Sequence, residues 1–304
     1  MGLVKPGHGS PDVARLEDYA PGIEVVESDL RDQDSLVGLI RDFAPHEIFN
    51  LGGISSIVES IENPELTHAV NVESVDAILA GMREVGSGPS GLTPRLVTAA
   101  SGTIFEGADR SPQNEGTDPS PHSPYAQSKV EVISKLRRAR EEEGLFVTSA
   151  ILYNHESPLR GEGFVTRKIS MAVARISAGM QNRLELGDIE VARDWGWAPD
   201  YVRAMQLMAA AESPHDYVLA SGISHRLSFF LDKAFAAAGI LDWSNFVVSA
   251  EVNQRKVDTN LLVGDSRRAY LELGWRHTID FDSMAVAMVE FDIELLRKPD
   301  LVWA

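Results

Sequence analysis

Tyr125 and Lys129 form a Tyr-x-x-x-Lys pair, and Ser101 precedes the tyrosine by 24 residues. Positions i and i+4 of a helix share a face, so the Lys129 ammonium would lie one turn from the phenol and favour the phenolate. Ser101, at the end of a predicted strand, would hydrogen-bond the same substrate oxygen as the phenol. Alone, the pair would equally suit an exposed tyrosine and lysine on a surface helix. Together with Ser101, it predicts proton transfer beside a moving hydride.

Short β-branched runs alternate with helical patterns in the first half of the chain. The runs predict strands over residues 23–26, 47–51, 95–100 and 147–153, and the patterns predict helices over 33–43, 65–84 and 124–143. Ser123 and Pro124 suit the cap and first turn of the last helix. This βαβαβαβ series predicts an α/β fold, a Rossmann-like doubly wound parallel sheet. After about residue 156 Pro, Gly and Trp recur irregularly, which indicates a smaller C-terminal substrate-binding region.

Polar or glycine-rich turns follow each predicted strand. They are Asp29 to Asp32, Leu51 to Ser55, Ser101, and Asn154 with His155. Each turn by itself would serve as a cap or a bend. Because ligands of open α/β sheets bind at the carboxyl ends of the strands, the four turns together predict a dinucleotide and substrate cleft.

The composition excludes several other classes of protein. The 304 residues are 44% hydrophobic and contain no cysteine, which excludes disulfides and thiolate chemistry, and the eight histidines lack the spacing of a helical metal site. A net charge of −17 argues against general nucleic-acid binding. No apolar run is long enough to span a bilayer, and the first residues do not read as a signal peptide, so we expect a cytoplasmic protein without metal.

These motifs resemble the extended short-chain dehydrogenase/reductase superfamily, and within its nucleotide-sugar dehydratases most closely the GDP-mannose 4,6-dehydratase family. The resemblance runs from roughly residue 24 to residue 292. It is carried by Asn50-Leu-Gly-Gly-Ile-Ser55, Ser123-Pro-Tyr-Ala-Gln-Ser-Lys129, Asn154-His-Glu-Ser-Pro-Leu-Arg-Gly161, Phe164-Val-Thr-Arg-Lys168 and Arg193-Asp-Trp-Gly196. The last three blocks are the most diagnostic.

The resemblance implies a role for each matching residue. Catalysis would fall to Ser101, Tyr125 and Lys129. NADP, or else NAD, would contact Asp29, Leu30, Leu51, Gly52, Gly53, Ile54, Ser55, Lys129, His155 and Arg160. The nucleotide sugar would contact Asn154, Glu156, Val165, Lys168, Arg193, Arg255 and Asp258. Three of these, Lys168, Arg193 and Arg255, are cations in turn-rich sequence that could clamp two phosphates.

The resemblance also implies a division of labour, a reaction and an assembly. Residues 1–156, with contributions from about 187–222, would form the NADP-binding domain, and residues 157–304 mainly the substrate-binding region. GDP-mannose would become a 4-keto-6-deoxy product as hydride passes from C4 to NADP and back to C6. The helices at 65–84 and 124–143 would pair subunits into a homodimer or homotetramer, and neither nucleic acid nor membrane is an expected partner.

Thr103 is one departure from the family pattern, because it occupies the position of the family's proton-abstracting glutamate. A threonine hydroxyl does not take a carbon-bound proton at neutral pH without activation. Glu106 is three residues displaced, so we expect its side chain to point elsewhere. A C4 epimerase or reductase, or a noncatalytic nucleotide-sugar-binding homologue, therefore stays open beside the dehydratase.

The second departure is the absence of the glycine-rich turn expected some fifty residues before Asp29. One interpretation is that Leu3 and Val4 form a short first strand and that Gly7 and Gly9 form the turn after it. The other is that the sheet lacks its first strand and helix, which matches the Asp29 segment better. Since that turn carries the pyrophosphate to a helix N-terminus, its absence predicts weakened or absent NADP binding.

Overall fold

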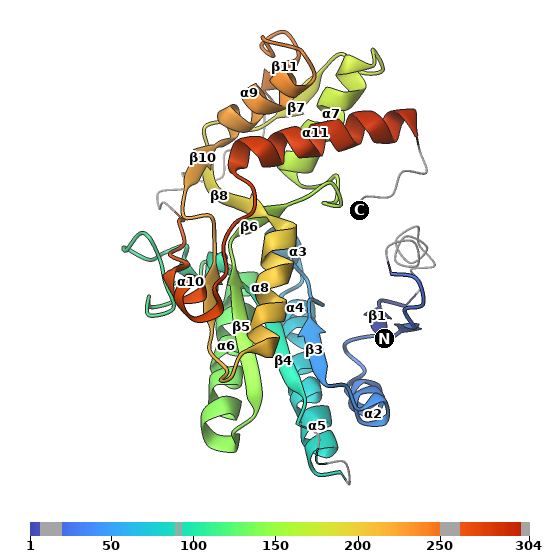
Figure 1. Ribbon diagram of the computed structural model, residues 1–304, viewed down its shortest axis with the longest axis vertical. Helices are drawn as coiled ribbons and strands as arrows, with labels where there is room; N and C mark the ends of the chain where they lie inside the picture. The colour runs from blue at the N-terminus through green and yellow to red at the C-terminus, as the bar shows by residue number, and fades with distance from the viewer. Residues whose placement is uncertain (7–19, 89–90, 92, 250–261, 299–304) are drawn as a thin grey trace.

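A parallel sheet of four strands lies at the centre of the computed structural model, which describes residues 1–6, 20–88, 91, 93–249 and 262–298 (Figure 1). The strand order is β3-β4-β5-β9, and every neighbouring pair is parallel. Their bounds are Glu47–Asn50 for β3, Arg95–Ser101 for β4, Phe146–Leu152 for β5 and Tyr217–Leu219 for β9. This sheet brings the ends of β3, β4 and β5 to one edge.

Helices cover both faces of this sheet because successive strand residues point to opposite sides. Leu96 of β4 packs among α2 (Gln33–Phe43), α5 (Ser74–Gly86) and α6 (Pro124–Glu143). The next residue, Val97, packs instead against α8 (Ala198–Ala210). The predicted α/β fold with a parallel sheet is confirmed.

The predicted helices agree closely with the observed ones. The ranges of α2 and α6 are the ones predicted, and the helix expected over 65–84 is a continuous run of α4 (Pro64–His68), a π-helical turn η1 (Ala69–Glu73) and α5. The strand predictions fall within two residues of β2, β3, β4 and β5. The short helix α3 (Ile57–Glu62) was not predicted.

A separate two-stranded sheet precedes α2. In it β1 (Gly2–Val4) pairs in parallel with β2 (Val25–Glu27). Leu3 and Val4 thus lie in a strand, but among the described residues no strand links β1 to β3. Gly7 and Gly9 lie outside the described residues, and the absence of the first strand and helix from the doubly wound sheet stays a prediction.

The C-terminal elements build a second core beyond the carboxyl edge of the central sheet, in the upper part of Figure 1. They include the strands β6 (Asn154–Glu156), β7 (Leu184–Leu186), β8 (Ala192–Trp197), β10 (Ser224–Arg226) and β11 (Val247–Ser249), and the helices α7 (Val165–Ser177), α9 (Leu227–Ala237) and α11 (Phe281–Arg297). Strands β10, β8 and β6 form one sheet and β11 and β7 another. The chain returns to the central sheet through α8, β9 and α10 (Arg267–Leu273), and no helix in the described ranges is long and apolar enough to cross a membrane.

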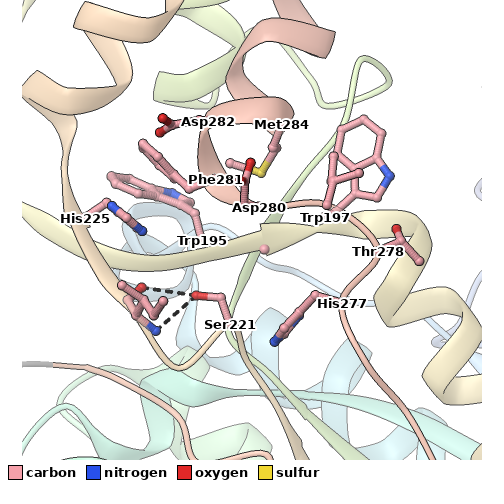
Figure 2. Close-up of a pocket in the computed structure, with 13 residues that line it drawn as sticks. Trp195, Trp197, Ser221, His225, His277, Thr278, Asp280, Phe281, Asp282 and Met284 are labelled. Carbon is pink, nitrogen blue, oxygen red and sulfur yellow. Dashed lines mark hydrogen bonds between the residues drawn. The ribbon is translucent and has the colours of Figure 1, made fainter.

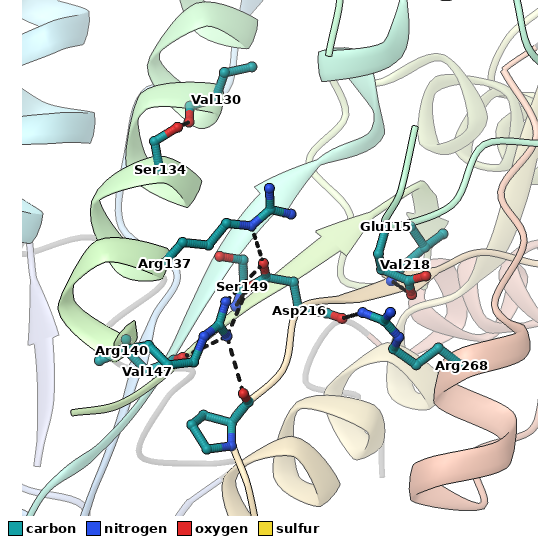
Figure 3. Close-up of polar contacts among 11 residues, drawn as sticks. Glu115, Val130, Ser134, Arg137, Arg140, Val147, Ser149, Asp216, Val218 and Arg268 are labelled. Carbon is teal, nitrogen blue, oxygen red and sulfur yellow. Dashed lines mark hydrogen bonds and ion pairs between the residues drawn. The ribbon is translucent and has the colours of Figure 1, made fainter. Parts of the chain in front are cut away.

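Asp216 fixes helix α6 against the end of the sheet (Figure 3). Its buried carboxylate accepts hydrogen bonds from Arg137 at 2.7 Å, from Arg140 at 3.2 Å and from the backbone N–H of Ser149 at 3.1 Å. Burial alone would raise the pKa of Asp216, but the two guanidinium groups outweigh it and lower that pKa. The helix that carries Tyr125 is therefore anchored at its distal half.

Candidate active site

Helix α6 presents Tyr125 and Lys129 at its first turns. Its Ser123 cap accepts a hydrogen bond from the N–H of Ala126 at 3.2 Å, and Pro124 occupies the first turn. The helix thus starts where the sequence predicts, one residue before the tyrosine. The i, i+4 spacing then directs both side chains toward the end of β4.

Tyr125 and Ser101 lie close enough for the serine hydroxyl to act on the phenol. Burial raises the pKa of Tyr125, and the charge of Glu106 raises it further, whereas the Ser101 hydroxyl and the positive charge of Arg160 oppose the change. Two side chains 24 residues apart in sequence therefore lie near each other at the end of β4.

Lys129 is buried beneath this pair. Its Nζ donates a hydrogen bond to the carbonyl oxygen of Ala99 at 2.9 Å and lies 5.8 Å from the centre of the Tyr125 ring. Burial lowers the pKa of Lys129 to about 8, so the amine still carries its proton at neutral pH. The expected proximity of ammonium and phenol is present, but Arg160 is the cation that acts on the pKa of Tyr125.

Thr103 orients the serine. It follows Ser101 in the 3₁₀ turn η2 (Gly102–Phe105), where its Oγ1 donates to the Ser101 Oγ at 3.0 Å and its N–H donates to the same oxygen at 3.3 Å. Ser101 Oγ thus accepts both bonds from Thr103, on the side of the site where Ser101 acts on Tyr125. In this arrangement Thr103 supports the hydrogen-bond donor of the site and supplies no carboxylate.

The glycine turn after β3 brings backbone close to Lys129. A Cβ on Gly52 would lie 2.7 Å from Leu30, and one on Gly53, which has φ +153°, would lie 2.8 Å from Asn71 and 3.9 Å from the Lys129 Nζ. The φ of Gly53 favours glycine, whereas a Cβ at Gly52 would displace the end of the Leu30 side chain. The turn also includes Leu51, Ile54 and Ser55, of which Leu51 is 64% exposed.

Asn71 is a site residue that the sequence reasoning missed. Its side chain accepts from the N–H of Ile54 at 2.8 Å and donates to the Ile54 carbonyl and to Ser128, each at 3.0 Å. It therefore ties the glycine turn to helix α6 next to Lys129. A signal was present in the sequence, because Asn71 interrupts the apolar run of Ala69, Val70 and Val72.

Asp29 lies at the end of β2, and its carboxylate accepts hydrogen bonds from the neighbouring Arg31, one of them from the guanidinium Nε at 3.0 Å. These bonds lower the pKa of Asp29 to about 2. Leu30 packs under Gly52. The segment is thus adjacent to the glycine turn, as expected for residues that line one cofactor site.

The residues after β5 converge on the same edge. His155 stacks on Tyr201 with ring centres 4.9 Å apart and donates from Nδ1 to the Tyr153 carbonyl at 2.8 Å, while burial lowers its pKa. Glu156 accepts from Thr166 at 2.6 Å, and the guanidinium of Arg160 lies 3.5 Å from its carboxylate. Burial raises the pKa of Glu156.

The remaining predicted substrate contacts lie around α7 and β8. Lys168 donates to the Glu185 carbonyl at 2.7 Å, and Arg193 donates to the Ala192 carbonyl at 2.8 Å. Asn154 is exposed on β6 and Val165 is 37% exposed at the first position of α7. Arg255 and Asp258 lie outside the described residues.

A hollow of about 480 Å³ lies between β8, β10 and the start of α11 (Figure 2), where its lining residues Trp195 and His225 pair with Asn154 and Arg193. Trp195, Trp197 and Phe281 lie around it, and its lining includes none of the predicted site residues. The chemistry-bearing side chains are at the edge of the central sheet, so we place the candidate site there.

The parallel sheet with Ser101, Tyr125 and Lys129 at its carboxyl edge defines a short-chain dehydrogenase/reductase fold, which solved structures share. RMD from Pseudomonas aeruginosa complexed with NADPH has a TM-score of 0.77 at 23% identity, covering 96% of this chain and 97% of that one. DesIV, a dTDP-glucose 4,6-dehydratase from Streptomyces venezuelae with NAD and TYD bound, has a TM-score of 0.80 at 22% identity, covering 96% and 86%.

Sequence relatives narrow the class. A family model described as GDP-mannose 4,6 dehydratase matches residues 10–288. GDP-mannose 4,6 dehydratase 2 of Arabidopsis thaliana is 39% identical over 271 residues, covering 89% of this chain and 72% of that protein. The chain belongs to the GDP-mannose 4,6-dehydratase family, which confirms the resemblance predicted from its motifs and makes it an enzyme of the dehydratase (lyase) type.

Proposed function

We propose that this chain converts GDP-mannose to its 4-keto-6-deoxy product by loss of water, with a bound nicotinamide cofactor. The observation that carries the proposal is the convergence of Ser101, Tyr125 and the buried Lys129 at the end of β4. These groups hold and move a proton on a sugar hydroxyl. The family to which the chain belongs supplies the substrate class.

The cofactor fits the edge of the sheet at its nicotinamide end. Gly52 and Gly53 leave a backbone surface that a Cβ would fill, and the Lys129 Nζ lies near Gly53 as a polar contact. When bound there, a nicotinamide accepts a hydride from C4 and later donates one to C6. We propose NADP over NAD, consistent with the NADPH in RMD, although DesIV carries NAD.

The residues of this chain would transfer protons and hold the reacting groups in place. Tyr125 takes the proton of the 4-hydroxyl, Ser101 hydrogen-bonds the same oxygen, and the positive charge of Arg160 favours the phenolate, while Lys129 lies 5.8 Å from the centre of the phenol ring. Thr103 holds the Ser101 hydroxyl in place, since it donates to the serine oxygen.

Substrate recognition would fall to the C-terminal region, over residues 157–304, and cofactor binding mainly to residues 1–156. We propose Asn154, Glu156, Val165, Lys168, Arg193, Arg255 and Asp258 as nucleotide-sugar contacts and Asp29, Leu30, Leu51, Gly52, Gly53, Ile54, Ser55, Lys129, His155 and Arg160 as cofactor contacts. We further propose a cytoplasmic homodimer or homotetramer, in keeping with the family resemblance.

Incubation of the purified chain with GDP-mannose and NADP tests the activity. The expected result is the 4-keto-6-deoxy product with no net formation of NADPH, and no product without the protein. A C4 epimer or a reduced sugar in its place would identify an epimerase or reductase. Tight GDP-mannose binding without turnover would identify a binding homologue.

Cofactor binding needs its own measurement, because the sequence analysis predicts weakened or absent NADP binding. Titration with NADPH, followed by its fluorescence, measures the affinity directly. Micromolar affinity would contradict the predicted weakness and support the role of the turn after β3.

A further inference from the structure

Glu106 lies one turn beyond Thr103 in a continuous 3₁₀ arrangement. The N–H of Glu106 donates to the Thr103 carbonyl at 3.2 Å, and the backbone of Glu106 stays helical with φ −55° and ψ −33°. Side chains three residues apart in a 3₁₀ turn eclipse each other. Glu106 therefore projects from the same side as Thr103, although the sequence spacing alone suggested that it points elsewhere.

This side of the turn faces the reaction site. Thr103 is hydrogen-bonded to Ser101, and the Ser101 hydroxyl acts on Tyr125. The backbone of the turn therefore directs Glu106 to the side of Thr103 and Ser101. In agreement with this direction, the charge of Glu106 raises the pKa of the phenol, although burial is the larger cause.

The loop after Glu106 is tightly held. Gly107 donates to the Ser120 carbonyl at 2.9 Å, and Ser120 donates to the Ile104 carbonyl at 2.7 Å. A Cβ on Gly107 would lie 2.3 Å from the Ser120 Oγ and 2.4 Å from the His122 Nε2. Because residues 120–122 lead directly into α6, these contacts fix the position of Glu106 relative to Tyr125.

We propose that Glu106 is the catalytic carboxylate that takes the C5 proton, in place of the glutamate that the family carries at position 103. The proposal rests on the proposed dehydration of a GDP-hexose. The 3₁₀ turn would place the Glu106 carboxylate on the same side as Thr103, which has no carboxylate of its own. The residue that acts as general base would then be determined by its place in the 3₁₀ turn and not by its alignment with the family's glutamate.

The elimination balances with this assignment. Oxidation at C4 makes the C5 proton acidic because the new carbonyl stabilises negative charge at C5. The C5–H bond breaks, its proton passes to Glu106, and its electron pair forms the C5–C6 double bond as the C6–O bond breaks. The proton on Glu106 leaves with the C6 hydroxyl as water. A reduced nicotinamide bound at the site would supply hydride to C6, and the proton that Tyr125 took from the 4-hydroxyl would add to C5.

The test compares the wild-type chain with Glu106→Gln, with the double variant Thr103→Glu/Glu106→Gln, and with Asp109→Asn. Asp109 is an exposed carboxylate in the same loop and serves as the matched control. We expect Glu106→Gln to lower product formation at least 100-fold. Reduced cofactor should still accumulate when this variant is mixed with GDP-mannose and NADP, because oxidation at C4 does not need Glu106. The double variant should recover at least tenfold, and Asp109→Asn should match the wild type.

A second readout does not depend on turnover. Ultraviolet titration of the phenols, with Tyr125→Phe to identify the Tyr125 signal, should show Tyr125 ionising at lower pH in Glu106→Gln than in the wild type. An unchanged titration would place the carboxylate away from the phenol and overturn the proposal.

The outcomes separate the two claims. If the wild type forms product and Glu106→Gln forms it equally fast, the proposed role of Glu106 is wrong, but the proposed dehydratase activity is supported. A wild type that forms no 4-keto-6-deoxy product overturns the proposed function, and the role of Glu106 with it. Loss in Glu106→Gln with recovery in the double variant supports both.

Discussion

The edge of the central sheet and the β1–β2 pair hold their functional side chains by different means. Ser101, Tyr125 and Lys129 come from a seven-residue strand and a 20-residue helix packed in the main core, and Lys129 is only 8% exposed. Asp29 follows a three-residue strand and contacts Arg31, with side chains 36% and 57% exposed. The side chains proposed for proton transfer are thus held by the core, whereas the proposed cofactor contact at Asp29 depends on local pairing.

Replacement of Tyr125 should produce the largest effect on chemistry. Tyr125→Phe removes the proton acceptor and keeps the ring, so we expect turnover to fall by roughly 100- to 10,000-fold. The GDP-mannose affinity should change little. Steady-state kinetics with calorimetric binding would check both, and a variant that keeps more than a tenth of the turnover would contradict the role of the phenol.

Lys129 should give the core region a distinctive pH dependence. Its pKa is 10.5 in the unfolded chain and about 8 in the folded one, so the unfolded state binds more protons between these values. Stability should therefore rise with pH in that window, by on the order of 2 kcal/mol relative to Lys129→Met. Urea unfolding of both proteins at pH 8 and pH 10 measures the difference, and parallel behaviour would refute the buried ammonium.

Gly53 links the two regions through the turn after β3. Gly53→Ala forces a Cβ against Asn71, so we expect a loss of about 1–2 kcal/mol in unfolding free energy and weaker NADPH binding. Gly144, with φ +69° and nothing within 4 Å of an added Cβ, is the matched control. Gly144→Ala should cost stability through backbone strain alone and leave NADPH affinity unchanged.

The smallest effect on stability should come from the β1–β2 side. Asp29→Asn breaks the exposed contacts with Arg31, which are screened by solvent. We expect no measurable change in the urea midpoint but weaker NADPH binding if Asp29 contacts the cofactor. A shift of the midpoint comparable to that of Gly53→Ala would show that the two regions are not held as differently as proposed.

Sequence alone predicted the elements that have strong periodic patterns or clear caps. Helix α6 follows from Ser123-Pro124 and its apolar face, and β4 follows from its β-branched run, so the sequence predicted the elements that carry Ser101 and Tyr125. Asn71 was missed because its role depends on a contact with Ile54, 17 residues earlier in the chain. The proposed direction of Glu106 could not be predicted because the 3₁₀ geometry of η2 has no signature in the spacing.

Transfer of the C4 hydrogen to C6 tests the central claim most directly. GDP-mannose labelled with deuterium at C4 is incubated with the chain and NADP, and the product is examined by proton and deuterium magnetic resonance. If Ser101, Tyr125 and Lys129 serve a site in which the hydride taken from C4 is returned to C6 of the same sugar, the label should appear at C6 of the 4-keto-6-deoxy product. Label that stays at C4, or that is recovered only in free reduced cofactor, would contradict the account.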